Sequence, residues 1–168
     1  MVEIISHVEV NAPPERVWQL LMDFEHYPEW HPFVRLGGSA AEGAVISYAN
    51  RWKPKSSRFV KSEATITRLD PNVHFGLKLG VPGLSWLDEW YALEATDSGT
   101  RLTHGVDTRG LLSLFVRLNR KRLTLYFQFP ILNIARRFAK PAPKPAVPAK
   151  PVRKGGLRPP NIPRRRRH

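Results

Sequence analysis

Residues 11–34 read NAPPERVWQLLMDFEHYPEWHPFV and combine a helix start, a short helix and an aromatic turn. Asn11 can accept a hydrogen bond from a free backbone N–H, and the two prolines that follow suit a first helical turn. Val17, Leu20 and Leu21 recur at three- and four-residue spacing, which predicts a helix with one apolar face. The prolines at positions 28 and 32 disfavour helical backbone before them, so we expect the aromatic residues there to form a tight corner.

This stretch resembles the opening of the START-like, or polyketide cyclase/dehydrase, superfamily (SRPBCC, helix-grip fold). The resemblance is carried by APPERVW at 12–18 and DFEHYPEWHPF at 23–33, with further similarity at 80–84 (GVPGL), 89–94 (EWYALE), 99–104 (GTRLTH) and 110–111 (GL). Together these motifs span most of residues 2–138. The resemblance implies a strongly curved antiparallel sheet wrapped around a long C-terminal helix, with an apolar cavity between them. Members include carriers, cyclases and chaperone-activating domains, so it implies no single reaction.

Alternation and turn residues predict a sheet of about seven strands. Val2–Val10 alternates, with Ile4, Ser6, Val8 and Val10 on one side. Six more strands are bounded by Gly, Pro, Asn and Asp, at Val34–Ser39, Ala44–Lys53, Arg58–Leu69, His74–Leu79, Trp86–Ala95 and Arg101–Arg109. No helical pattern separates them, so neighbouring strands should be antiparallel. The predicted class is α+β, with two short helices after the first strand.

A long amphipathic helix is predicted to begin at Leu111. One apolar stripe, which we expect to face the sheet, consists of Leu111, Leu114, Phe115, Leu118, Leu125, Phe129 and Leu132. Arg117, Arg120, Lys121 and Arg136 can face outward. Pro130 removes one helical hydrogen bond and costs about 3 kcal/mol unless the helix bends, so we expect a kink or break near Gln128–Phe129.

The positive charge is concentrated at the C-terminal end. The 168 residues carry a formal net charge of +13, but residues 140–168 hold 10 Lys or Arg and no acidic residue. The remaining 17 basic and 14 acidic residues give residues 1–139 a charge of only +3. We therefore predict one domain at 1–139 and a disordered tail rich in Pro, Lys and Arg at 140–168. The tail is either a neutral extension or an electrostatic attachment to anionic membranes or nucleic acid.

Several classes of protein are excluded by composition. The chain has no cysteine, so it has no disulfides, thiol nucleophiles or thiolate metal sites. It lacks a signal-peptide pattern and a membrane-spanning run of about 18 apolar residues, so we expect a cytoplasmic protein. Its six histidines show neither one-turn spacing nor a His-Glu-x-x-His motif. We therefore predict no metal and no cofactor, in a monomer or weak dimer.

Aromatic and apolar side chains are the candidates for a ligand cavity, because rings on a curved sheet can line it while a polar edge orients the ligand. Packing in an ordinary core is the alternative explanation for most of them. The predicted cavity residues are Trp30, Phe33, Tyr48, Trp52, Trp86, Trp90, His104, Leu118, Leu125 and Phe129.

Three functions stay open from the sequence. The first is binding of a small hydrophobic or amphipathic molecule, such as a lipid, polyketide or aromatic compound, between the sheet and the C-terminal helix. The second is a metal-free cyclase or dehydrase that moves protons with polar cavity residues, for which the candidates are His104, Glu63 and Asp107. Asp88 and Glu89 are further strand carboxylates that could act as acid or base. The third is a module that interacts with a protein or a membrane.

Overall fold

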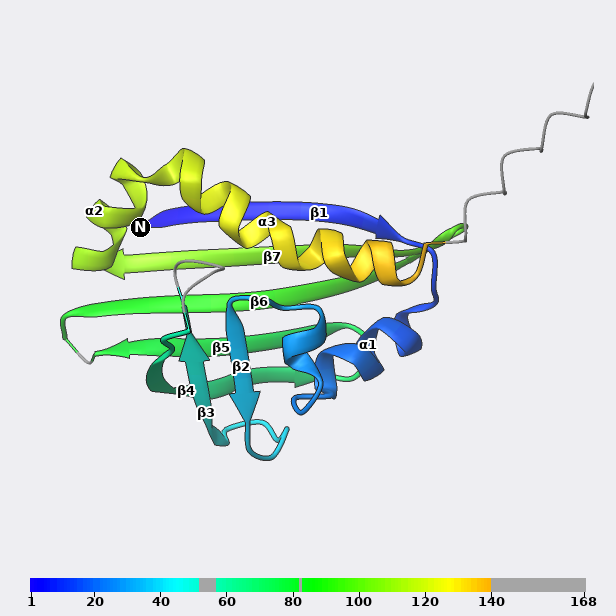
Figure 1. Cartoon of the computed structure of the whole chain (residues 1–168), viewed down its shortest axis with the longest axis horizontal. Helices are drawn as coiled ribbons and strands as arrows, with labels where there is room; N and C mark the ends of the chain where they lie inside the picture. The colour runs from blue at the N-terminus through cyan, green and yellow to red at the C-terminus, as the bar shows by residue number, and fades with distance from the viewer. Residues whose placement is uncertain (52–56, 82, 140–168) are drawn as a thin grey trace, which may run out of the picture.

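A computed structural model describes residues 1–51, 57–81 and 83–139. Its sheet has seven strands in the order β1-β7-β6-β5-β4-β3-β2, and all neighbours are antiparallel. The strands are β1 (Val2–Val10), β2 (Val34–Gly37), β3 (Val45–Asn50), β4 (Val60–Asp70), β5 (His74–Val81), β6 (Ser85–Thr96) and β7 (Gly99–Gly110). Figure 1 shows that the sheet curls, because β2 and β3 run across the direction of β1, β6 and β7. The predicted antiparallel meander is confirmed.

The helices lie inside the curl of the sheet. They are α1 (Pro14–Met22), the 3-10 helix η1 (Tyr27–Glu29), α2 (Leu111–Leu118) and α3 (Arg120–Arg137). The long helix α3 packs along β1 and β7 (Figure 1). This arrangement confirms the predicted helix-grip fold of class α+β, including the two short helices after the first strand.

Helix α1 forms as predicted, but Asn11 does not cap it. Pro14 is at the first helical position, and Val17 and Leu21 are fully buried. Asn11 instead donates its side-chain amide to the carbonyl of Phe138, 3.5 Å away at the end of α3. The residue therefore joins the start of α1 to the C-terminal end of α3.

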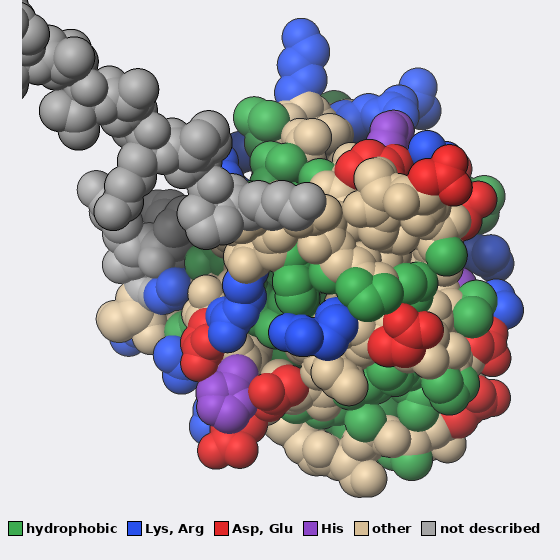
Figure 2. All heavy atoms as spheres, turned by 90° about the vertical axis from the view of Figure 1, so that its right-hand side faces the viewer, with side chains coloured by type: hydrophobic (Ala, Val, Ile, Leu, Met, Phe, Trp, Pro, Cys, Tyr) green, Lys and Arg blue, Asp and Glu red, His purple; other side chains and the backbone are tan. Residues whose placement is uncertain are grey.

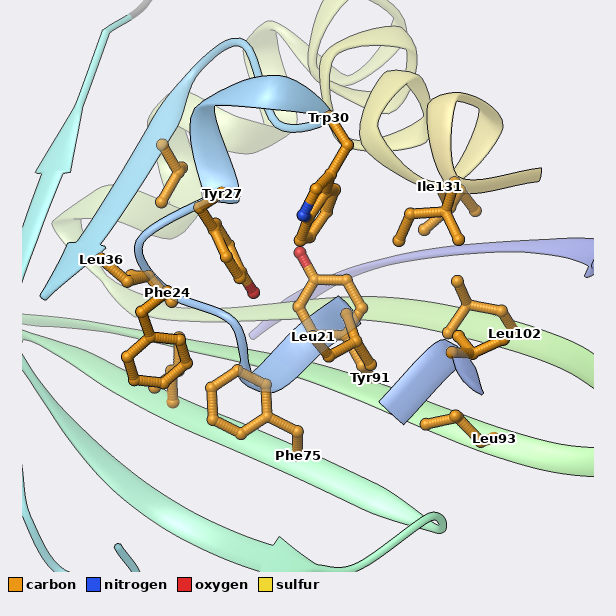
Figure 3. Packing of buried hydrophobic residues seen from close by; sticks show 14 of the residues in the cluster. Leu21, Phe24, Tyr27, Trp30, Leu36, Phe75, Tyr91, Leu93, Leu102 and Ile131 are labelled. Carbon is orange, nitrogen blue, oxygen red and sulfur yellow. The ribbon is translucent and has the colours of Figure 1, made fainter. Parts of the chain in front are cut away.

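The aromatic corner closes the core between η1 and the concave face of the sheet. The rings of Tyr27 and Trp30 lie 4.3 Å apart between centroids, and Phe24 contacts both Tyr27 (5.9 Å) and Phe75 of β5 (6.0 Å). Figure 3 shows these rings gathered with Tyr91 over the sheet. Aromatic burial of this extent is a large stabilising contribution, since each ring removes 150–250 Å² from water.

The predicted apolar stripe of the C-terminal helix is wrong. Leu118 and Leu125 are 77% and 68% exposed, whereas Val116, Leu123 and Phe127 are buried. The helical segment is apolar on more than one side, so periodicity alone does not say which stripe faces the sheet. The break also lies elsewhere: α2 and α3 are separated at Asn119, and α3 continues through Pro130.

Two sequence predictions fall outside the described residues: the cavity role of Trp52 and the disordered tail at 140–168. Among the helices that the structure describes, none has the length and apolar character needed to cross a bilayer.

Candidate functional site

An apolar cavity of about 160 Å³ lies between the helices and the concave face of the sheet. Helices α2 and α3 form one wall, and strands β3, β5 and β6 form the other. The lining residues are Tyr48, Asn50, Leu79, Gly80, Leu87, Leu112, Val116, Leu123, Tyr126 and Phe127. Most of these side chains are apolar, and the rings of Tyr48 and Tyr126 are among them, with their hydroxyls bonded to Glu89 and to the carbonyl of Arg51 respectively.

A buried polar cluster adjoins this cavity, and we define it as Tyr48, Glu89, Tyr91 and His104. Glu89 is only 3% exposed. One of its carboxylate oxygens accepts hydrogen bonds from the Tyr91 hydroxyl (3.2 Å) and from Nε2 of His104 (3.0 Å), and the other accepts from the Tyr48 hydroxyl (3.0 Å). A buried carboxylate with three donors is satisfied, so it can remain in a low-dielectric core.

The hydrogen bonds of His104 define where its protons lie. Its Nδ1 is 2.8 Å from the carbonyl oxygen of Phe127, which can only accept, so Nδ1 carries a proton. Burial alone would raise the pKa of Glu89, but the hydrogen bond and charge of His104, with smaller contributions from His31 and Tyr48, hold it below the usual value of 4.5. Glu89 is therefore ionised, and both of its carboxylate oxygens act only as acceptors.

The same carboxylate keeps the surrounding phenols protonated. Burial, followed by the negative charge of Glu89, raises the pKa of Tyr48 and Tyr91 well above 10. Both hydroxyls therefore donate to Glu89 throughout the physiological pH range. The cluster is a buried carboxylate held by two neutral phenols and the imidazole of His104, and Tyr48 is its member that also lines the cavity.

Strand alternation and register bring this cluster together. Glu89 and Tyr91 are two residues apart on β6. His104 lies on the neighbouring strand β7, directly opposite Tyr91 in the register. The imidazole stacks on the Tyr91 ring with centroids 4.4 Å apart and planes 8° apart. The carbonyl of Phe127 approaches from α3, so the cluster connects the sheet to the helix.

Two polar atoms next to this region have no partner among the described residues. They are the Tyr27 hydroxyl and the Trp30 indole N–H, both fully buried. Figure 3 shows the Tyr91 hydroxyl directed toward the indole of Trp30, with the Tyr27 hydroxyl nearby. Unsatisfied buried donors are costly, so this part of the core is suited to a bound water or a polar group of a ligand.

The structure places five of the predicted cavity residues in or near the core. Tyr48 lines the cavity, and His104 lies directly behind it. Trp30 and Phe33 are buried in the core, where Phe33 stacks on the cavity residue Tyr126 at 4.2 Å. Phe129 is 43% exposed and touches the far side of Phe33.

The remaining predicted cavity residues do not face the cavity. Trp86 and Trp90 alternate with the inward-facing residues of β6, so they lie on the outer face of the sheet. There the ammonium of Lys78 lies over the ring of Trp86, and the ring of His74 stacks on Trp90. Leu118 and Leu125 are on the outer side of the helices. The physical reason is the same in both cases, because one residue of offset in a strand, or about half a turn in a helix, reverses the face.

The three candidate catalytic residues do not form one group. His104 belongs to the buried cluster, whereas Glu63 is exposed on the outer face of β4. Asp107 also faces outward, where its carboxylate accepts a hydrogen bond from the Trp90 indole at 3.3 Å. The hydrogen-bond partner of His104 is Glu89. Glu89 has the same parity along β6 as the apolar residues Leu87, Tyr91 and Leu93, and this alternation is the sequence signal that places its side chain on the inner face.

The histidines are dispersed over the described part of the chain, which contains no group of three or more His, Cys, Asp or Glu side chains able to hold a metal ion. His26 pairs with Asp23 at the surface (2.8 Å). His31 is buried and accepts a hydrogen bond from the backbone N–H of Val34 at its Nδ1 (3.1 Å).

Comparison with known proteins gives a consistent result for the fold. A family profile described as "Polyketide cyclase / dehydrase and lipid transport" matches residues 1–139. No curated protein sequence matches the chain. Protein CV1439 from Chromobacterium violaceum is similar in structure, with a TM-score of 0.66 at 16% identity over 81% of this chain and 96% of that one.

Two further solved structures share the fold. Protein Ms6760 from Mycobacterium smegmatis has a TM-score of 0.64 at 16% identity, over 83% of this chain and 92% of its own. DynU16, a protein in the dynemicin biosynthetic locus, has a TM-score of 0.60 at 15% identity, over 80% of this chain and 46% of its own.

Proposed function

Because the chain belongs to the polyketide cyclase/dehydrase and lipid transport family over residues 1–139, we propose that it binds a small hydrophobic molecule carrying one polar group. The observation that supports this function most directly is the apolar cavity between α2, α3 and the sheet, which has Tyr48, a member of the polar cluster, among its lining residues. An apolar ligand body would be buried there, and a single hydroxyl or carbonyl could meet the edge of the polar cluster.

The cavity volume limits the size of the ligand. A dry apolar cavity of about 150 Å³ is large enough to bind benzene. The cavity here, about 160 Å³, therefore accommodates one aromatic ring or a short aliphatic segment without rearrangement. A longer lipid or a fused polyketide exceeds this volume and would have to extend beyond the lining residues or displace them.

Filling the cavity should abolish binding of a one-ring probe. Val116 and Leu123 are 3% and 4% exposed and line the cavity, so Val116→Trp or Leu123→Trp would place an indole in the ligand volume. We expect the affinity for 4-ethylphenol, measured by calorimetry, to fall at least tenfold, with a loss of stability no greater than the roughly 1–3 kcal/mol typical of overpacking.

Matched controls come from the same helices. Leu118→Trp and Leu125→Trp add the same ring on the exposed side and should leave 4-ethylphenol binding unchanged. The proposal fails if the inward variants unfold the protein or bind the probe as the wild type does, because the volume would then be ordinary core packing.

The polar cluster supports a second candidate, proton transfer to a bound ketone. Tyr48 lines the cavity and donates to Glu89, which also accepts from His104, so a hydroxyl and an ionised carboxylate lie behind one lining residue. Polyketide cyclisation and dehydration both need a proton removed next to a carbonyl and a donor for its oxygen. This candidate places the chemistry at Tyr48, Glu89 and His104 rather than at Glu63 and Asp107.

Exchange of the α-protons of cyclohexanone in D₂O, followed by NMR, would test this second candidate. If the cluster acts as an acid–base group, Tyr48→Phe should slow protein-dependent exchange by about 10²-fold or more while the ketone still binds. Glu63→Gln, on the outer face, should exchange like the wild type. Absence of protein-dependent exchange would restrict the function to binding.

A further inference from the structure

The outer side of α2 and α3 is both apolar and basic, and we call it the α2–α3 face. Leu111, Leu114 and Leu118 recur along one side of α2 and are 67%, 59% and 77% exposed. Leu125 of α3 is exposed as well, at 68%. Isolated exposed leucines are common, but a contiguous row of them marks an interaction surface.

The turn between β5 and β6 extends this face. The backbone N–H of Leu111 donates to the carbonyl of Leu84 at 3.3 Å, so the turn adjoins the start of α2. Leu84 and Val81 are themselves half exposed. Figure 1 shows α2 and the adjoining ends of β5 and β6 at one end of the molecule, far from α1 and from the C-terminal end of α3.

Cations surround the leucines without acidic residues between them. Arg117, Arg120, Lys121 and Arg122 line a shallow depression at the α2–α3 turn together with Leu118. From Thr108 to Ala139 the sequence contains seven Lys or Arg and no Asp or Glu. The opposite end differs, because Figure 2 shows acidic and basic side chains intermixed there.

We propose that the α2–α3 face docks on an anionic lipid bilayer, with the leucines inserted among the acyl chains and the cations at the phosphate level. Alternation of exposed leucines with Arg and Lys is the composition of a helix that lies in a membrane interface. Each cation near an anionic surface strengthens binding about fivefold. The inference is independent of what the cavity binds.

Charge complementarity favours a bilayer over the other possible occupants. A symmetric dimer through this face would place the cations of one copy against the same cations of its partner, with no carboxylate from residues 108–139 to neutralise them. A nucleic acid would pair with the cations but leave the leucines in water. An anionic bilayer satisfies both groups of side chains.

The absence of native cysteines permits a site-specific test on the full chain. Leu118→Cys and, as a control on β3, Val45→Cys would each carry an environment-sensitive nitrobenzoxadiazole dye; Val45 is a similarly exposed apolar residue at 62%. With vesicles of phosphatidylcholine and phosphatidylglycerol, the dye at position 118 should brighten and shift to the blue, and the dye at position 45 should not. Neither should respond to vesicles of pure phosphatidylcholine.

Substitutions separate this face from the ten cations beyond residue 139. We expect Leu114→Gln with Leu118→Gln to weaken vesicle binding at least tenfold at 300 mM salt, where purely electrostatic attachment is screened, whereas Val45→Gln changes nothing. Arg117→Gln with Arg120→Gln should weaken binding about 25-fold at low salt.

Three results would overturn the proposal. The first is binding to anionic vesicles in which the two dyes respond equally or not at all, since the C-terminal cations would then act alone. The second is unchanged vesicle binding by the double leucine variant. The third is a stable dimer in light scattering that the leucine substitutions dissociate, because the occupant of the face would then be a second copy of the chain.

Discussion

Replacement of Glu89 by alanine should lower the free energy of unfolding by about 3–5 kcal/mol, since it leaves three buried hydrogen-bonding groups without their acceptor. These groups are Nε2 of His104 and the hydroxyls of Tyr48 and Tyr91, which share Glu89, itself only 3% exposed, as their acceptor. For a domain of this size the melting temperature should fall by about 10 °C or more. Urea denaturation and thermal melts followed by circular dichroism would measure both quantities.

Glu63→Ala provides the matched control for this experiment. Glu63 is a strand carboxylate like Glu89, but it is exposed on the outer face of the sheet, so its loss should change stability by no more than about 0.5 kcal/mol. Equal effects of the two substitutions would contradict the stabilising role of the buried cluster around Glu89. A further variant, Glu89→Gln, keeps the side-chain volume and one acceptor oxygen, and should therefore be intermediate.

Most of the fold could be predicted from local sequence signals. The alternation of β1 places Ile4, Ser6 and Val10 on the buried side as expected, and the turn residues locate all seven strands to within a few positions. These predictions succeed because period two and the turn chemistry are properties of short segments. The choice between two apolar stripes on the C-terminal helices is different, since it depends on where a break occurs, and the break at Asn119 carries no strong local signal.

The candidate site was less predictable because it depends on pairing between distant segments. His104 was identified, but its partners lie on β3, β6 and α3, and their contacts follow from register and from the docking of α3. Strand parity does distinguish the two faces of β6, because Glu89 and Tyr91 are at odd positions whereas Trp86, Asp88 and Trp90 are at even ones. The carbonyl of Phe127 had no sequence signal at all, because any residue supplies a backbone carbonyl.

His31 should make the domain sensitive to mild acid. Burial, the largest cause, lowers its pKa from 6.5 to about 3, even though the charge of Glu89 acts in the opposite direction. In the unfolded chain His31 takes up a proton below pH 6.5, while the folded protein excludes it down to about pH 3, so stability rises with pH across this window. The contribution of the neutral His31 to the free energy of unfolding is complete above pH 6.5 and is lost as the pH falls toward 3. The total loss is at most about 5 kcal/mol.

The variant His31→Asn should remove this acid sensitivity while it keeps the local hydrogen bond. The Asn side-chain oxygen can replace Nδ1 as the acceptor for the backbone N–H of Val34, which lies 3.1 Å from the imidazole. The free energy of urea unfolding, measured from pH 5.0 to 7.5 so that Glu89 stays ionised, should then depend on pH less steeply by up to about 1.4 kcal/mol per pH unit.

His26→Asn is the control with the opposite sign, because the hydrogen bond and charge of Asp23 raise the pKa of that exposed histidine. Its loss should not reduce the acid sensitivity, and an equal flattening in both variants, or none in His31→Asn, would show that the acid-sensitive group is not the buried imidazole.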